Sequence, residues 1–112
     1  MRAYAQVPLT IWQYSGSLAA AGSMSSGSYP CLGYARLTGM LYSSASAESA
    51  SGLRIYQSSD YGQTWDYWYD SVPTAISGSA YSVEVVGNTI KVNYKTDSAA
   101  ASVRLLFALR PI

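Results

Sequence analysis

Strict alternation of apolar and polar residues over the last third of the chain leaves few folds open to it. The alternation is strict over residues 81–86 and 89–95, and residues 102–110 follow as a final strand signal. Neighbouring side chains on a strand point to opposite faces, so a period of two predicts strands with one buried face. Gly87 and Asn88, between the first two segments, fit the two-residue loop of a tight hairpin. The expected inward side chains are Tyr81, Val83, Val85, Ile90, Val92, Tyr94, Val103, Leu105, Phe107 and Leu109.

Further strand-like segments lie at residues 9–14, 34–42, 53–57 and 66–69, with a short one near 17–20. No amphipathic segment of helix length separates them, and 112 residues suit one domain. The sequence predicts an all-β, single-domain antiparallel β-sandwich, jelly-roll-like, with about seven to eight strands. Gly39, on the expected core face of its strand, predicts a bulge or a close approach by another backbone.

Residues 58–65 bring serine, aspartate, glycine, threonine and tryptophan together within eight positions and predict a turn between two strands. Hydroxyl and carboxylate side chains can bind loop amides, glycine can take a positive φ, and tryptophan can fold back as an apolar plug. The spacing resembles the Asp-box of sialidase-type propellers and other β proteins, where it stabilises a hairpin. A single copy cannot build a propeller, whose blades repeat. The predicted structural turn consists of Ser58, Asp60, Gly62, Thr64 and Trp65.

The first 15 residues are interpreted separately from a sandwich domain at 16–112. If Leu9 and Ile11 point inward, Trp12 points outward. Either choice of buried face therefore exposes a large apolar side chain. Two readings stay open: an arm that lies on a neighbouring subunit, and an ordinary edge strand. Under the first, Leu9, Ile11 and Trp12 are candidate partner contacts.

A dense aromatic run occupies residues 65–69. Alternation would place Trp65, Tyr67 and Tyr69 on one side of a strand and Trp68 on the other. Exposed aromatic rings stack on sugars or anchor protein interfaces, which makes Trp68 a further candidate partner contact. The alternative is that both sides are buried between the sheets and a crossing loop.

Composition argues against several function classes. The chain has no histidine, so a Ser-His or Cys-His pair is impossible. Its seven Lys and Arg residues are scattered and the net charge is +1, which disfavours nucleic-acid binding. The N-terminus lacks the apolar core of a signal peptide, and the longest apolar run is too short for a membrane span. Cys31 has no intramolecular partner and is expected to be a buried thiol.

Acidic residues gather loosely around the predicted turn. Asp60, Asp66 and Asp70 could suit a hard cation, but their spacing matches no calcium loop. With Glu84 they could also supply the two carboxylates of a glycosidase. Nothing in the sequence, however, places any two of these carboxylates at the distance that glycoside hydrolysis requires. A solvated face is favoured, and neither a catalytic residue, a metal nor a cofactor is expected.

Several segments taken in order resemble small β-sandwich virion proteins of tailed bacteriophages, which are decoration (cement) or other minor structural components. These segments are residues 33–39, 53–60, 65–66, 82–87, 103–105 and 109–111. The chain departs from the pattern where Tyr61 separates Asp60 from Gly62, and in its first 15 residues.

This resemblance implies a non-enzymatic protein of the virion, made in the host cytoplasm, that binds the major capsid protein or another virion protein as a homo-oligomer. No nucleic-acid or membrane partner is expected. The alternative is a carbohydrate-binding β-sandwich that recognises a receptor or surface glycan through Trp68 and nearby tyrosines. A glycosidase fragment is a third reading and would need a paired carboxylate site.

Overall fold

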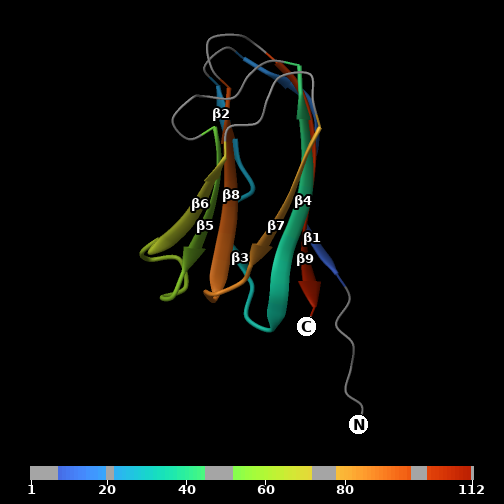
Figure 1. Cartoon of the computed structure of the whole chain (residues 1–112). Coiled ribbons are helices and arrows are strands. Elements are labelled where there is room, and N and C mark those ends of the chain that lie inside the picture. Colours follow the sequence, from blue (N-terminus) through green and yellow to red (C-terminus); the bar gives the residue numbers. More distant parts are fainter. Residues whose placement is uncertain (1–7, 20–21, 45–51, 72–77, 97–100, 112) are drawn as a thin grey trace.

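The computed structural model describes residues 8–19, 22–44, 52–71, 78–96 and 101–111, and within them the chain forms nine strands and no helix. Two antiparallel sheets face each other as two layers (Figure 1). The prediction of an all-β sandwich is confirmed. The strands are β1 (Leu9–Leu18), β2 (Ser23–Ser25), β3 (Tyr29–Pro30), β4 (Tyr34–Ser43), β5 (Leu53–Ser58), β6 (Tyr67–Ser71), β7 (Ser79–Glu84), β8 (Thr89–Lys95) and β9 (Ala101–Pro111).

One sheet has the strand order β1-β9-β4-β7, and the other has the order β2-β8-β5-β6. The two-residue strand β3 also pairs with β8, beside β2. The sheet edges are therefore β1 and β7 in the first sheet, and β6 and the β2/β3 pair in the second. No helix in the described part of the chain is long and apolar enough to cross a membrane.

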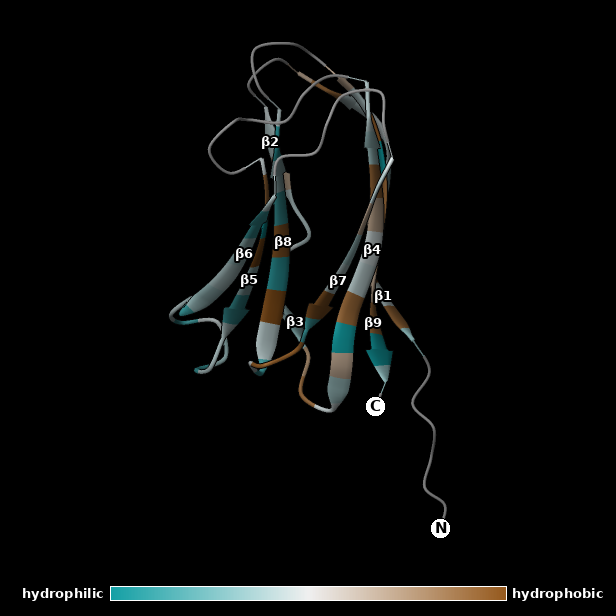
Figure 2. Cartoon of the chain, in the orientation of Figure 1, coloured by the Kyte–Doolittle hydropathy of each residue, from teal (hydrophilic) through white to brown (hydrophobic). Residues whose placement is uncertain are grey.

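Apolar side chains from the facing surfaces of both sheets form one core. Burial alternates along most of β8 and β9, with breaks at Thr89 and Ala108, and the predicted inward residues Ile90, Val92 and Phe107 are fully enclosed. Figure 2 shows the pattern as brown and teal bands along β8. Removing this apolar surface from water is the main driving force that holds the two layers together.

The predicted hairpin at Gly87 and Asn88 is wrong. Strand β7 pairs with β4 in one sheet, whereas β8 pairs with β5 in the other, so the short connection crosses between the layers. Alternation fixes which face of a strand is buried but not which strand lies beside it. At the crossover, a Cβ on Gly87 would lie 2.5 Å from the carbonyl oxygen of Ser58, so the glycine permits this close passage.

Gly39 makes room for a row of aromatic rings across the inner face of the first sheet. The ring of Phe107, which is fully buried, lies where a Cβ of Gly39 would be, and the Leu106 carbonyl would be 2.8 Å from that Cβ. Trp12 and Tyr81 stack on the two sides of Phe107 at centroid distances of 6.3 and 6.2 Å. A close approach is therefore present, chiefly by a side chain, and the register through Gly39 has no bulge.

A bulge in β1 resolves the conflict between Ile11 and Trp12. The register against β9 shifts between Thr10 and Trp12, so Ile11 is the extra residue. Ile11 is 3% exposed, and Trp12 is partly buried against the core. Strand β1 lies at the edge of the first sheet and continues past residue 15 to Leu18, while residues 1–7 lie outside the described residues.

Candidate functional site

The turn at residues 58–65 is built around two oxygen atoms. The buried Ser58 hydroxyl accepts hydrogen bonds from the amides of Asp60 and Gly62, at 3.2 and 2.9 Å, and donates to Asp60 Oδ1 at 2.7 Å. Asp60 Oδ1 also accepts from the Thr64 amide at 2.8 Å. The Ser58 hydroxyl and the Thr64 amide lower the pKa of Asp60, so its carboxylate stays ionised in the turn.

The backbone of the turn takes two consecutive positive φ values, 60° at Tyr61 and 91° at Gly62. Tyr61, the residue that departs from the virion-protein pattern, donates its amide to Asn88 Oδ1 at 3.1 Å. The Trp65 ring folds back over Gly62, where a Cβ would lie 3.6 Å from the indole. The five residues of the predicted structural turn thus run from the last residue of β5 to the loop before β6, and Asn88 ties this loop to the crossover.

Replacing Ser58 with alanine is expected to lower the free energy of unfolding by about 2 kcal/mol, because two amides and one carboxylate oxygen lose their partner. The matched control is Ser59→Ala, since the exposed Ser59 hydroxyl donates to exposed Asp66 and its loss should cost less than about 0.5 kcal/mol. Urea unfolding of both variants measures the difference. Equal effects would show that the Ser58 hydroxyl does not hold the turn.

The outward face of the second sheet carries a cluster of aromatic and cationic side chains, here called the aromatic face. It consists of Tyr56, Trp65, Trp68, Arg54 and Lys91. Tyr56 lies at its centre, 6.1 Å from Trp65 and 6.2 Å from Trp68 between ring centroids. Trp65 therefore shares a face with Trp68, and its predicted placement beside Tyr67 is wrong because β6 begins only at Tyr67.

Cations cover the rings of the aromatic face. The Arg54 guanidinium lies 5.2 Å from the Trp68 centroid, and the Lys91 ammonium lies 4.6 Å from that of Trp65. Arg54 also binds Asp70 through two hydrogen bonds of 2.5 and 3.1 Å. Hydrogen bonding to Asp70 raises the pKa of Arg54, so the guanidinium keeps its charge. A sugar that stacks here would first have to displace a cation.

The acidic side chains have separate roles and do not converge. Asp60 organises the turn, Asp66 accepts from Ser59, and Asp70 pairs with Arg54. Within the described ranges no three ligand-type side chains come close enough to hold a metal ion. The arrangement among these residues is that of structural contacts, not of a carboxylate pair aimed at a common substrate.

Strand β6 ends the second sheet and exposes three consecutive aromatic residues. Tyr67, Trp68 and Tyr69 are 49%, 46% and 41% exposed. Trp68 points outward with its cross-strand neighbour Tyr56, whereas Tyr67 and Tyr69 lie on the inward side at the rim of the sandwich. There Tyr81 of β7 meets Tyr69 edge-on at 6.4 Å and contacts the Ser71 hydroxyl at 3.1 Å. This free edge is called the β6 edge below.

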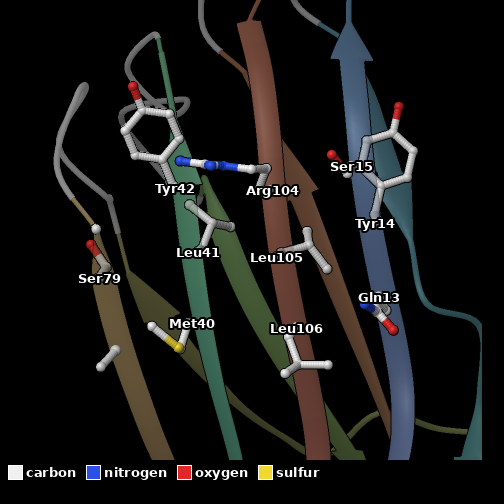
Figure 3. Close-up of a pocket in the computed structure, with 12 residues that line it drawn as sticks. Gln13, Tyr14, Ser15, Met40, Leu41, Tyr42, Ser79, Arg104, Leu105 and Leu106 are labelled. Atoms are coloured by element: carbon white, nitrogen blue, oxygen red, sulfur yellow. The ribbon is translucent and has the colours of Figure 1, made fainter.

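A groove of about 760 Å³ lies on the first sheet (Figure 3). Exposed Met40 and Leu106 form part of its floor, and Arg104 reaches across to the Tyr42 ring at 4.7 Å. Its lining includes no carboxylate, so these residues offer no acidic general acid or base. The groove is an apolar sheet face with one cation at its end.

Cys31 is fully buried, and its thiol donates to the Gly87 carbonyl at 3.3 Å. Burial raises the pKa of this thiol from 9.0 to about 11. The folded thiol thus keeps its proton to higher pH than the unfolded thiol does. A buried, protonated thiol is a poor nucleophile and a poor metal ligand at neutral pH.

The stabilising effect of the protonated Cys31 thiol should be complete below pH 9.0 and be lost as the pH rises through about 11. We therefore expect the stability difference between wild type and Cys31→Ala to shrink over that interval. Urea unfolding at a series of pH values measures this stability difference. Both proteins contain the same tyrosines, so the effect of tyrosine ionisation cancels in the difference. A difference that is constant with pH would contradict the assignment.

The predicted partner contacts lie in different environments. Leu9 is 38% exposed and Trp68 is on the β6 edge, whereas Ile11 is enclosed and Trp12 is partly buried. The structure also reveals side chains that the sequence analysis did not single out, chiefly Gln57 and Tyr56. The shared parity of Arg54, Tyr56 and Trp68 around the turn could have indicated the aromatic face, but nothing in the sequence marks Gln57.

Comparison with known proteins gives distant likeness in structure. No protein-family model matches the chain, and no curated protein matches it. The chain is similar to one in a structure of infectious bursal disease virus, Gx strain, with 16% sequence identity and a TM-score of 0.47. The alignment covers 92% of this chain and 31% of that chain, so this chain spans about a third of that neighbour's length.

Proposed function

We propose that this chain is a non-enzymatic structural protein of a virion, a decoration or cement protein that binds the capsid lattice through surfaces of its β-sandwich. The observation that carries the proposal is the β6 edge, where three adjacent aromatic residues are exposed together. Tyrosine and tryptophan are enriched at the centres of protein interfaces. The low charge of the chain and the ordered segments that resemble phage virion proteins support the same role.

A cement protein must hold two neighbours, and the fold offers two separated contact regions. The β6 edge lies beside β7, as the contact between Tyr69 and Tyr81 shows. Leu9 lies on β1, at the opposite edge of the sheet from β7. Trp68 and Leu9 are therefore the proposed contacts with different neighbours, while the enclosed Ile11 side chain supports β1 from within.

Heating virions with and without the chain tests the cement role. Virions that contain it are expected to disrupt at a higher temperature than virions that lack it, and Trp68→Ala should remove most of the gain. Leu32→Ala is the matched control, because Leu32 is an exposed apolar residue outside both contact regions. Equal disruption temperatures for virions with and without the chain would refute cementing.

A carbohydrate-binding role is the second candidate. A groove of about 420 Å³ adjoins the aromatic face and is lined by Arg54, Tyr56 and Asn93. Asn93 Oδ1 is buried there without a hydrogen-bond partner among the described residues, so the Asn93 side chain would have to turn outward to accept from a sugar hydroxyl. A glycan array should then give a signal that Trp68→Ala abolishes. A signal at background level would remove this candidate.

A further inference from the structure

We propose that two copies of this chain pair through their β6 edges, antiparallel and across a two-fold axis at Tyr69, so that one sheet continues through both copies. The occupant of the edge is thus a second copy of the chain. The inference goes beyond the capsid-binding role, and the isolated protein tests it without any virion. In the dimer the second copy is the neighbour that Trp68 contacts, and Leu9 on β1 of each copy is left for a capsid subunit.

Three of the four sheet edges carry features that hinder pairing with another strand. The β1 edge has a bulge at Ile11, and bulges disrupt the regular row of backbone donors and acceptors. The β2/β3 edge is divided between strands of three and two residues, and Pro30 lies in the second. On β7, the Arg36 side chain already donates to the Ser82 carbonyl at 3.2 Å.

The β6 edge lacks these protections. Its register with β5 runs without a shift from Leu53 to Gln57, and β6 contains no proline and no lysine. An exposed, regular edge strand is a template for another strand. A paired copy would also cover aromatic surface on both faces of the sheet, namely Trp68 outside and Tyr67 and Tyr69 at the rim.

Geometry and charge select the register. Opposite residues in an antiparallel pair share a face, so the two-fold axis must pass through one residue and its own copy. An axis at Trp68 would place Asp66 opposite Asp70 of the other copy, and an axis at Asp70 would place the two Asp70 residues together. Like charges directly opposite are destabilising. An axis at Tyr69 avoids both and pairs all five residues of β6.

The axis at Tyr69 also brings different side chains of the two copies into contact. With the axis at Tyr69, Trp68 of each copy lies opposite Asp70 of the other. The Asp70 side chain stays 38% exposed beside Arg54, so the incoming indole packs against a carboxylate that Arg54 screens only in part. Arg54 also lies 5.2 Å from the ring of its own Trp68, so the two clusters become one continuous outer surface.

Sedimentation equilibrium of the purified full chain is the first test. Its mass should rise from 12.0 kDa towards twice that value as the concentration increases to about 100 µM. A chain that remains monomeric over that range overturns the proposal, as does a dimer whose formation is unaffected by changes in β6. The proposed function can still fail separately, if the dimer forms but does not bind capsids.

Two variants of Trp68 test the register while removing the same ring. Trp68→Glu places a negative charge opposite Asp70 of the other copy, whereas Trp68→Lys places a positive charge there. The lysine variant is expected to dimerise about tenfold more tightly than the glutamate variant. Thermal melts check that both variants fold. Equal dimer affinities would overturn the proposed register.

Disulfide trapping gives an independent measurement. In this register Tyr69 faces its own copy, with Cα atoms about 5 Å apart, within reach of a disulfide. Tyr67 lies about 14 Å from its copy along the strands and is the matched control. Oxidised Tyr69→Cys should run as a covalent dimer and Tyr67→Cys as a monomer, with the buried Cys31 unreactive in both. Dimers of the Tyr67 variant alone would contradict the axis at Tyr69.

Discussion

Replacing Gly39 with alanine is expected to lower the free energy of unfolding by at least about 3 kcal/mol. The added methyl group would overlap the Phe107 ring and lie 2.8 Å from the Leu106 carbonyl oxygen. Phe107 cannot move away, because Trp12 and Tyr81 stack on its two sides. Thermal unfolding should show a midpoint lower by about 10 °C or more.

Gly16→Ala is the matched control for this substitution. Gly16 lies on β1, and its added Cβ would meet the Tyr14 hydroxyl at 2.9 Å, the far end of a side chain that can turn away. Its cost should stay below about 1 kcal/mol. Combining Gly39→Ala with Phe107→Leu should cost less than the sum of the two single changes, since the smaller side chain makes room. Strict additivity would show that Phe107 is not the obstacle.

Replacing Gln57 with alanine is expected to destabilise the chain by about 3 to 5 kcal/mol. The buried Gln57 amide donates to the Glu84 carbonyl at 2.8 Å and accepts from the amides of Val86 and Gly87 at 2.7 and 3.0 Å. It thereby joins β5 to the crossover between the sheets. Its loss leaves three backbone groups without a partner and opens a cavity.

Urea unfolding of Gln57→Ala and Gln63→Ala provides the comparison. Gln63 lies in the neighbouring turn with an exposed side chain, so its change should cost less than about 0.5 kcal/mol. Amide hydrogen exchange adds a local readout, because the amides of Val86 and Gly87 should lose protection in the Gln57 variant before the β8 amides do. Unchanged protection at those two amides would show that Gln57 does not hold the crossover.

Local patterns in the sequence predict the strands, their buried faces and the turn. Alternation marks Val92 and Phe107 as inward, and the spacing of Ser58 and Asp60 predicts a hydrogen-bonded loop, because both signals depend on neighbours within a few residues. The partner of each strand depends on long-range packing. The pairing of Val83 with Leu37, in place of a hairpin with β8, therefore could not be predicted.

In the candidate site, too, local sequence predicts some features and long-range packing decides the others. Trp68 is marked by its place in an aromatic run, but Trp65 was assigned to the wrong face because the start of β6 depends on the loop conformation. Gln57 looks like any polar strand residue until the crossover brings Val86 and Gly87 against it. The bulge at Ile11 likewise follows from packing Trp12 onto Phe107, a contact between the two ends of the chain.

Co-sedimentation of the purified chain with shells of the major capsid protein from the same virus tests the assembly role most directly. The wild-type chain is expected to pellet with the shells in a saturable ratio, and Trp68→Ala should weaken this binding while Leu32→Ala should not. A chain that stays in the supernatant at every shell concentration, although it is folded, would contradict a structural role in the virion.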